Sequence, residues 1–398
     1  TDVTGALGSG AASVASGGTL QLGGGFDTGT TAIGNQGTVR FQGKASAGTS
    51  TITNAAGGVL AFADDATADK ATVLNQAGAQ VRIDQSTTGV SFGSLSGAGE
   101  FVLGAKALTL GASGDSTTLS GTISGNGGSV VKVGAGTLTL TGANTYTGGT
   151  TVGAGTLSVN NKSGSATGTG AVLVQSGATL AGSGSIAGAV TIDKGGILAA
   201  GNSPGTLTLG ALTLAGGSTL NYELGQAGVP GGALNDLINV TGNLQLDGTL
   251  NIAQSAGGSF GPGLYRLMSY GGSFTDNGLD IGTVPGSAKV ADLQVQTSVA
   301  NQVNLVNRAG LSLNFWDGGD STKYNDGQIA GGSGIWRVGN PQPSMDAWAD
   351  MDGKLNANWA QNQFAVFGGK AGTVTVDAAG GAVRIAGAQF ATDGYVVQ

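Results

Sequence analysis

The sequence predicts an all-β fold: a right-handed parallel β-helix, which is a solenoid with about 20 residues in each coil. Three features of the chain support this prediction. A large apolar residue recurs with this period, apolar and polar residues alternate within each repeat, and glycines separate the short alternating stretches.

The period is seen at the first large apolar residue after each glycine-containing turn. The first ten such residues are Leu20, Val39, Leu60, Val81, Phe101, Leu119, Leu138, Leu157, Leu180 and Leu198. Every step from one to the next is close to the same length, about 20 residues. Steps of similar length over so many units indicate a solenoid, in which each repeat packs on its neighbours.

Each repeat has the pattern of short β-strands. Val131-Lys132-Val133 and Leu138-Thr139-Leu140 alternate apolar and polar residues, which is typical of a strand with one buried face. Glycines between such stretches permit the positive φ angles of tight corners. One repeat therefore makes a coil of about three short strands, and successive coils stack in parallel. The general preference for right-handed parallel crossovers gives the expected handedness.

The composition separates this chain from ordinary globular enzymes. Of its 398 residues, 79 are glycine and 10% are charged, whereas about 7% glycine and about 25% charged residues are usual. The net charge is −7 and the 16 basic residues are scattered, so nucleic acid is not an expected partner. No apolar run reaches the roughly 20 residues of a membrane-spanning helix.

Two residue types that carry much enzyme chemistry are absent. The lack of cysteine excludes disulfides, thiol nucleophiles and thiolate metal ligands, and the lack of histidine excludes a Ser-His-Asp triad and histidine-ligated zinc. The sequence therefore assigns no catalytic residue, no cofactor-binding residue and no metal ligand. It predicts a non-enzymatic protein that uses no cofactor.

One stretch carries a long and specific motif. Residues 134–161 read GAGTLTLTGANTYTGGTTVGAGTLSVNN, in which GAGTL occurs first at Gly134 and again at Gly153. The stretch resembles the passenger-associated transport repeat of bacterial type V autotransporters. The matching positions are Gly134, Gly136, Thr137, Leu138, Leu140, Gly142, Asn144, Tyr146, Gly148, Thr150, Val152, Gly155 and Leu157. Residues 182–225, 260–274 and 371–397 are also similar to segments of the pertactin-like β-helix in such passengers.

This resemblance implies a β-helical stalk on the bacterial cell surface, exposed at the outer membrane, or secreted. In this family the stalk is tethered through a C-terminal barrel of amphipathic strands with aromatic girdles. The sequence up to Gln398 shows no such strands. We therefore expect a passenger segment of a longer protein. The family most often implies adhesion or self-association. The expected partner is a host surface protein or glycan, or a second copy of the chain.

The regular repeat is interrupted after residue 200. The period stretches well beyond its usual length between Leu220 and Leu250, which predicts a loop insertion near 225–236. We therefore expect a regular parallel β-helix over residues 1–309. All four tryptophans come later, so residues 310–398 are predicted to be a tryptophan-bearing continuation of the β-helix.

The tryptophan-bearing segment contains two groups of oxygen ligands. Their members are Asp317, Asp320, Asn325, Asp326, Asp346, Asp350 and Asp352. Calcium is the ion that such ligands suit, especially in the Gly-rich loop near 317–327. Their spacing matches neither D-x-[DN]-x-[DN]-G nor the Gly-Gly-x-Gly-x-Asp nonapeptide, and Asp and Asn beside glycine are common in turns, so turn chemistry is the favoured interpretation. The tryptophans themselves allow two interpretations, internal packing or a sugar-stacking platform.

Two alternative functions stay open. β-Helices also form polysaccharide lyases and glycosidases, which use paired carboxylates. Glu100 and Glu223 are the only glutamates, so aspartates on adjacent coils would have to complete such a pair. The other alternative is a purely structural surface fibre. Threonine runs such as 137–141 suggest ice-binding ladders, but we do not expect them to recur at one position in successive coils.

Overall fold

The computed structural model of the protein describes residues 2, 3, 7, 9–286, 288–339 and 346–398. The chain forms two compact units. Unit 1 comprises Thr1–Asn202, Leu207–Thr219 and Gly242–Gln245, and unit 2 comprises Ser203–Thr206, Leu220–Thr241 and Leu246–Gln398. The boundary between residues 309 and 310 that the sequence suggests stays a prediction.

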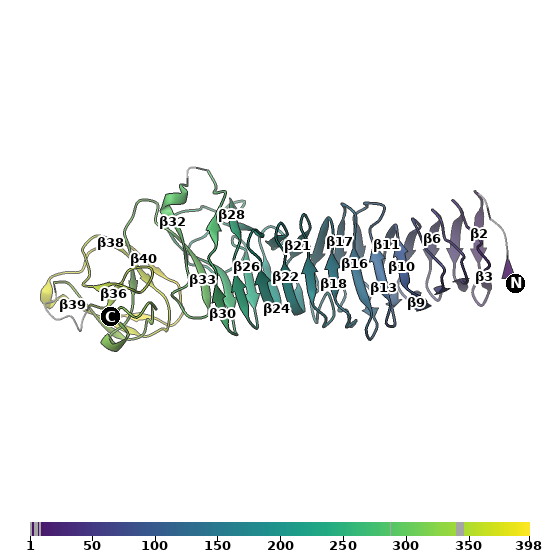
Figure 1. Ribbon diagram of the computed structural model, residues 1–398. Coiled ribbons are helices and arrows are strands. Elements are labelled where there is room, and N and C mark those ends of the chain that lie inside the picture. Colours follow the sequence, from purple (N-terminus) through teal and green to yellow (C-terminus); the bar gives the residue numbers. More distant parts are fainter. Residues whose placement is uncertain (1, 4–6, 8, 287, 340–345) are drawn as a thin grey trace. The chain divides into compact units, whose positions relative to one another are not determined.

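Unit 1 begins with two parallel sheets whose strands come from successive coils (Figure 1). The first sheet has the order β1 (Asp2–Val3), β3 (Thr19–Leu22), β5 (Thr38–Phe41), β7 (Val59–Asp64), β9 (Gln80–Ser86), β12 (Glu100–Val102) and β15 (Ile123–Ser124). The second has the order β11 (Ser94–Ser96), β8 (Thr72–Asn75), β6 (Thr51–Asn54), β4 (Ala32–Asn35) and β2 (Ala11–Val14). Thr19 lies beside Thr38, and Thr38 beside Val59, so the chain returns to the same sheet once in each predicted repeat. The predicted all-β solenoid and its period are confirmed.

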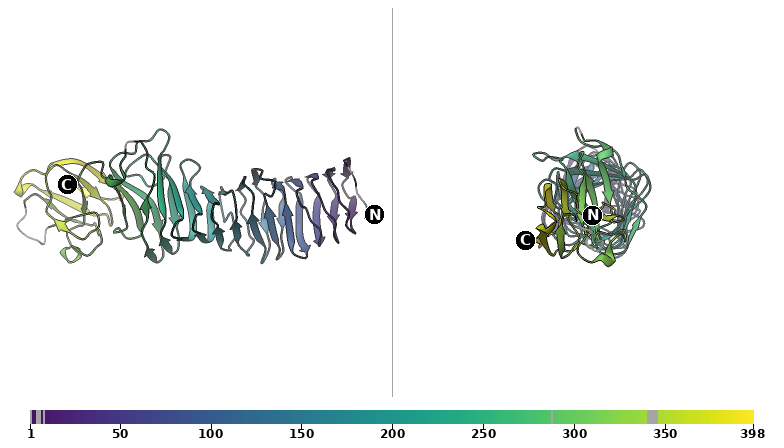
Figure 2. Two further views of the ribbon diagram at one scale, coloured as in Figure 1. Left: turned by 45° about the horizontal axis from the view of Figure 1, so that its top comes forward. Right: turned by 90° about the vertical axis from the view of Figure 1, so that its left-hand side faces the viewer.

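Two other sheets of unit 1 continue the stack, which Figure 2 shows from a second direction. The first seven strands of the third sheet are, in order, β10 (Gly89–Phe92), β13 (Ala107–Leu110), β16 (Ser129–Lys132), β18 (Thr150–Val152), β20 (Val172–Val174), β22 (Ser185–Ile192) and β24 (Thr206–Leu214). The first five strands of the fourth sheet are, in order, β14 (Thr117–Leu119), β17 (Thr137–Leu140), β19 (Thr156–Val159), β21 (Thr179–Gly182) and β23 (Ile197–Ala200). In the coils before β10, the corresponding segment makes only isolated bridges, from Asp27 to Ser46 and from Ser46 to Thr67. The sides of the coil that form continuous sheets therefore change along unit 1.

This change corrects two steps in the predicted series of apolar residues, those before and after Leu119. The series from Leu20 to Phe101 consists of register partners in the first sheet. Phe101 then pairs with Ile123, whereas Leu119 belongs to the fourth sheet and pairs with Leu140. Both sheets contain alternating strands that follow a glycine. A series defined by the first apolar residue after a glycine turn therefore changes from the first sheet to the fourth at this point.

The core of unit 1 is a column of apolar side chains inside the coils. In β17 and β19, Leu138 and Leu157 are buried neighbours, and the residues on either side of each are partly exposed. Phe41 stacks on Phe62 of the next coil with 5.0 Å between ring centroids. Burial of apolar area stabilises by about 25 cal/mol per Å², so every coil gains stability from the coils on both sides.

A ladder of three buried asparagines supports one corner of the first coils. The Nδ2 of Asn35 donates to the Oδ1 of Asn54 at 2.7 Å, and the Nδ2 of Asn54 donates to the Oδ1 of Asn75 at 2.8 Å. Asn54 also donates to the carbonyl oxygen of Gln80 at 2.9 Å. The side-chain amides thus hydrogen-bond from coil to coil where the backbone turns between two sheets.

Unit 2 combines parallel and antiparallel strands. β26 (Leu237–Val240) pairs in parallel with β29 (Gly263–Tyr270), and β29 pairs antiparallel with β33 (Gln302–Asn307). β32 (Leu293–Gln296) is also antiparallel to β33. The prediction of an ordinary parallel coil at 260–274 is therefore right for one neighbour of β29 and wrong for the other. Residues 225–236 connect β25 (Thr219–Leu224) to β26 without a strand.

The last strands of unit 2 form two small sheets. One has the order β37 (Asn356–Ala357), β36 (Trp348–Ala349), β34 (Leu313–Trp316), β38 (Gln363–Phe367) and β40 (Ile385–Phe390), and the other has the order β35 (Gly334–Arg337), β39 (Thr373–Asp377) and β41 (Val396–Val397). The remaining strands are β27 (Leu244–Leu246), β28 (Thr249–Gln254), β30 (Phe274–Asp276) and β31 (Asp280–Ile281). β34, β38 and β40 are parallel, whereas β36 is antiparallel to β34.

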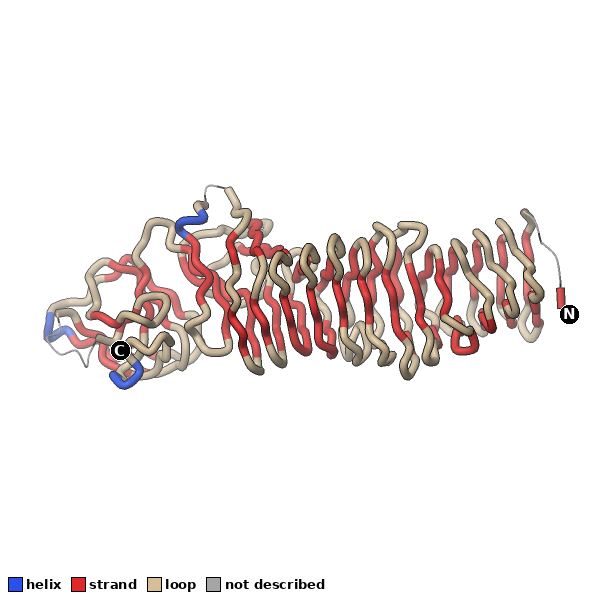
Figure 3. The backbone as a smooth tube through the Cα atoms, viewed as in Figure 1, coloured by secondary structure: helices blue, strands red, loops and turns tan. Residues whose placement is uncertain are grey.

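Helices are short in the part of the chain that the structure describes. They are 3₁₀ turns of three residues at Val290–Asp292, Ser321–Lys323 and Ala378–Gly380 (Figure 3). Among the described residues, none of them is long and apolar enough to cross a membrane.

Candidate functional site

The outward face of the fourth sheet carries a short row of hydroxyl groups. Thr137, Thr156 and Thr179 are register partners on three successive coils, and all three are partly exposed. The sequence interpretation that threonines do not recur at one position is wrong for these coils. The row ends at Ile197, so it presents three threonines spaced by the distance between strands, about 4.8 Å.

Within the GAGTL-repeat segment, Asn144 joins three coils at a place where the first sheet has ended. Its Oδ1 accepts a hydrogen bond from the backbone N–H of Ile123 at 2.7 Å. Its Nδ2 donates to the carbonyl oxygen of Ala166 at 2.5 Å. Residues 142–148 form no named strand, but their backbone bonds to the coil before, as from the N–H of Thr145 to the carbonyl oxygen of Ile123 at 2.9 Å. The side chain of Asn144 adds two further hydrogen bonds between coils at this place.

Tyr146 and Lys132 support the same coils from inside. The Tyr146 hydroxyl is fully buried and shares a hydrogen bond of 2.6 Å with the Thr150 hydroxyl. The Lys132 ammonium donates to the carbonyl oxygens of Val133, Gly134 and Ala154, at 2.8, 2.8 and 3.1 Å. Burial lowers the pKa of Lys132. Lys132 therefore ties neighbouring coils together, and its ammonium group is not available to a ligand.

The oxygen ligands near 317–327 mostly hold the backbone. Asp317 is buried, and its carboxylate accepts from the backbone N–H of Ala330 at 2.7 Å and from the Nδ2 of Asn356 at 2.9 Å. Asp320 accepts from the backbone N–H and the hydroxyl of Thr322, and Asp326 from the backbone N–H of Gln328. These contacts are those of turns and loop anchors. Within the described residues, no group of three or more acidic side chains is placed to hold a metal ion.

The second group of aspartates shows the same chemistry. Asp350 accepts from the backbone N–H groups of Lys354 and Leu355, at 2.9 and 3.3 Å. Asp352 accepts from the Nε2 of Gln294 at 3.3 Å. Burial raises the pKa of Asp346. These contacts agree with turn chemistry, the interpretation that the sequence favours for both groups.

The four tryptophans form a packed cluster. Trp316, Trp336, Trp348 and Trp359 are exposed by 0 to 4%. Trp348 is central, with ring centroids 4.6 Å from Trp359, 4.9 Å from Trp336 and 5.2 Å from Trp316. Because no ring face is open to solvent, these residues are packing and not a sugar-stacking platform.

Two acidic residues of unit 2, Asp236 and Glu223, are joined through the backbone N–H of Glu223. The buried Asp236 accepts hydrogen bonds from the backbone N–H groups of Gly205 at 2.8 Å and Glu223 at 2.7 Å. The Glu223 carboxylate accepts from the Ser203 hydroxyl at 2.7 Å. Both oxygens of Asp236 hold backbone, and the side chain is 2% exposed, so Asp236 anchors the loop at 203–206 and does not reach a substrate.

We expect Asp236 to make stability depend on pH. Burial is the main cause that raises the pKa of Asp236, to about 6. The two backbone N–H donors lower this pKa, and the negative charge of Glu223 raises it further. Because the folded state then binds the proton more tightly than the unfolded state, the free energy of unfolding falls as the pH rises from about 4 to about 6. Urea unfolding midpoints measured by circular dichroism at pH 4 and pH 7 should therefore differ more in the wild type than in Asp236→Asn. Equal differences in both proteins would contradict this assignment.

Comparisons with known proteins agree with the repeat and the fold. The family model of the passenger-associated transport repeat matches residues 130–159, which include Lys132, Asn144 and Tyr146. The chain is 48% identical over 209 residues to the adhesin BmaC autotransporter of Brucella suis biovar 1 (strain 1330). The match covers 52% of this chain, but only 6% of the length of that relative. The repeat, the relative and the parallel solenoid together support the assignment of this chain to the passenger segments of bacterial type V autotransporters.

Proposed function

We propose that this passenger segment is a non-enzymatic adhesive solenoid, which acts at the bacterial cell surface or after secretion. The observation that carries the proposal is the 48% identity, over about half of the chain, to a protein named as an adhesin. The proposed partner is a host surface protein or glycan, or a second copy of the chain. The solenoid contributes uncharged outward rows at a fixed spacing, such as Thr137, Thr156 and Thr179.

Such rows suit many weak contacts. A hydroxyl group can donate and accept hydrogen bonds, and neighbouring coils repeat it without charge repulsion. Each contact contributes about 0.5–1.5 kcal/mol at most, so useful affinity requires several coils to engage together, as in multivalent binding. The buried interior of each coil supplies the rigidity that keeps the rows in register.

Bead adhesion tests the proposal. Beads coated with the chain should adhere to epithelial monolayers, or to one another, more than albumin-coated beads do. The double variant Thr137→Glu/Thr179→Glu should reduce adhesion several-fold, because the charges disrupt the row. The matched control is Thr151→Glu/Thr191→Glu, which places the same charges at partly exposed positions of the third sheet.

The result also separates the alternatives. Wild-type beads that adhere no better than albumin beads would leave a structural fibre as the better account. The enzyme alternative would be established if the chain cleaves polygalacturonate and if replacing one of its aspartates abolishes that activity. Equal losses in both double variants would show that charge alone, and not the threonine row, controls adhesion.

A further inference from the structure

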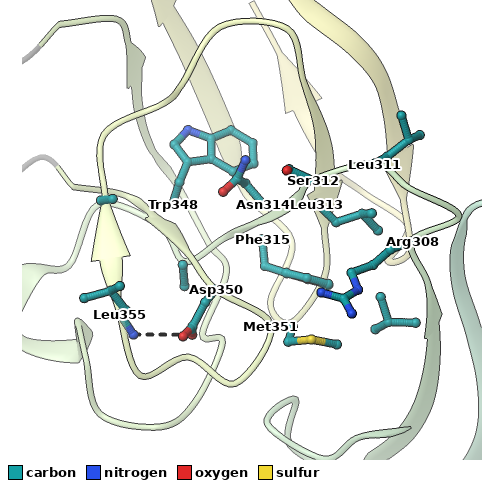
Figure 4. A pocket seen from close by; sticks show the side chains of 13 residues that line it. Arg308, Leu311, Ser312, Leu313, Asn314, Phe315, Trp348, Asp350, Met351 and Leu355 are labelled. Atoms are coloured by element: carbon teal, nitrogen blue, oxygen red, sulfur yellow. Dashed lines mark hydrogen bonds between the residues drawn. The ribbon is translucent and has the colours of Figure 1, made fainter. Parts of the chain in front are cut away.

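Unit 2 contains a cavity of about 320 Å³ that the outward threonine rows do not involve. It lies beside β34 and the turns around β36 and β37 (Figure 4). Its lining residues are Val306, Arg308, Leu311, Ser312, Leu313, Asn314, Phe315, Trp348, Ala349, Asp350, Met351, Leu355 and Ala357. The volume falls in the range of small-ligand sites, about 300–1,000 Å³.

The inner wall of the cavity is apolar. Leu313 and Phe315 are buried members of one hydrophobic cluster, and Met351 packs against it. Two leucines border the cavity with large exposed fractions, 39% for Leu311 and 66% for Leu355. Leu355 is the most exposed of the large apolar side chains in the described residues. An apolar group placed in the cavity would remove the exposed surface of Leu311 and Leu355 from water.

Polar groups stand on opposite sides of this apolar wall. Figure 4 shows Arg308 on one side and Asp350 with Leu355 on the other, with Phe315 and Met351 between them. The Nη2 of Arg308 donates to the carbonyl oxygen of Ala291 at 2.9 Å, and its Nη1 has no hydrogen-bond partner among the described residues. One oxygen of Asp350 accepts the two backbone N–H groups of its own turn, and the other oxygen has no such donor in that part of the chain.

Among the described residues, Arg308 has no carboxylate partner. The salt bridges of the described residues join Arg82 to Asp84 and Arg337 to Asp377, so Arg308 is in neither. A guanidinium group binds carboxylates well because it presents several N–H donors in one plane. The cavity thus offers an apolar wall, a free cation on one side and a free carboxylate oxygen on the other.

We propose that this cavity binds an extended peptide segment of a partner protein, in which a leucine-like aliphatic side chain precedes an acidic residue. The aliphatic side chain occupies the space between Phe315, Met351 and Leu355. The acidic side chain pairs with Arg308, and a backbone N–H of the peptide donates to the free oxygen of Asp350. This site goes beyond adhesion through outward rows, because it recognises one side-chain pair at one place.

The alternatives fit less well. A sugar ring would need an open aromatic face, but Phe315 and Trp348 are exposed by 1% and 2%. A purely aliphatic ligand would leave Arg308 without an anion. A peptide has both the side chain and the charge that the wall and the guanidinium group require.

Methionine methyl NMR tests the proposal on the intact chain. The chain has three methionines, of which Met351 lines the cavity and Met268 is fully buried outside it. The probe is the peptide N-acetyl-Gly-Leu-Glu-Gly-amide. It should shift the Met351 methyl signal in a saturable way and leave Met268 unchanged. Peptides with Gln in place of Glu, or Ala in place of Leu, should bind about tenfold more weakly, which is about 1.4 kcal/mol.

Variants separate the side chains of the site. Arg308→Gln should remove the preference for Glu over Gln in the peptide, and Leu355→Ser should weaken the Glu peptide by a similar factor. Leu355 is mostly exposed, so its substitution keeps the fold, and Ile335→Ser is the matched control at another exposed apolar position, outside the cavity. The proposal is overturned if Met351 does not respond, or if all three peptides shift it equally. A response to maltotriose and not to peptides would overturn it in favour of a glycan.

Discussion

Replacement of Trp348 by alanine is expected to destabilise unit 2 by about 3–5 kcal/mol, the range measured for large aromatic residues in protein cores. Trp348 is 2% exposed, and its ring packs against three other tryptophans and against Phe367, whose ring centroid is 5.4 Å away. The substitution leaves a cavity that these large rings cannot close without leaving their own positions. Few single changes in this chain remove so many ring contacts.

Fluorescence measures this effect directly. All four tryptophans lie between Trp316 and Trp359, so the emission of the remaining three reports on this cluster alone. Urea unfolding followed by fluorescence should show a clearly lower midpoint for Trp348→Ala. Ile335→Ala, at an apolar position that is 42% exposed, should unfold close to the wild type. A loss below about 1 kcal/mol for Trp348→Ala would mean that the cluster repacks freely.

The second large effect is expected in the asparagine ladder of unit 1. Asn54→Leu keeps a side chain of similar size but removes the donor to Asn75 Oδ1 and to the carbonyl oxygen of Gln80. Each acceptor left unpaired in a buried place costs about 1–3 kcal/mol. Because the middle amide connects three coils, its loss weakens both of its neighbours.

Thermal unfolding followed by circular dichroism, together with hydrogen exchange of residues 32–86, measures this second effect. The Asn54→Leu variant should unfold at a lower temperature and lose protection at the corner that Asn35, Asn54 and Asn75 share. Thr51→Ala lies in the same strand, β6, at an exposed position, and should behave like the wild type. Equal unfolding temperatures for both variants would show that the ladder contributes little.

The ladder also shows a signal that reading the sequence missed. Asn35, Asn54 and Asn75 each end a short alternating strand, and they follow one another once in each repeat. Their spacing is that of the apolar series, so the recurrence can be detected in the sequence. The sequence does not show what the asparagines do, because asparagine after a strand is also common in ordinary turns. Only the stacked coils show that these amides bond to one another.

Asp236 and Lys132 had no comparable signal. Asp236 belongs to a loop insertion, and its two donors, at Gly205 and Glu223, are 31 and 13 residues away in sequence. Lys132 occupies a polar position in an alternating strand, where an outward side chain would be expected, yet it is buried. Such contacts depend on where the chain returns after a coil, and local patterns do not contain this information.

The sequence by itself determined the architecture of this protein and its repeat family. A period of about 20 residues, alternation within each repeat and the motif around Asn144 are local features, and a stacked solenoid repeats local features from coil to coil. The tertiary structure alone decided which strands of successive coils pair in one sheet. It pairs Phe101 with Ile123, and not with Leu119 as the period suggests. It also decided that the tryptophans are buried and that Arg308 and Leu355 border one cavity. The physical reason is that hydrophobic alternation specifies that a residue is inside or outside a coil, whereas its neighbours depend on the positions of corners far apart in the chain.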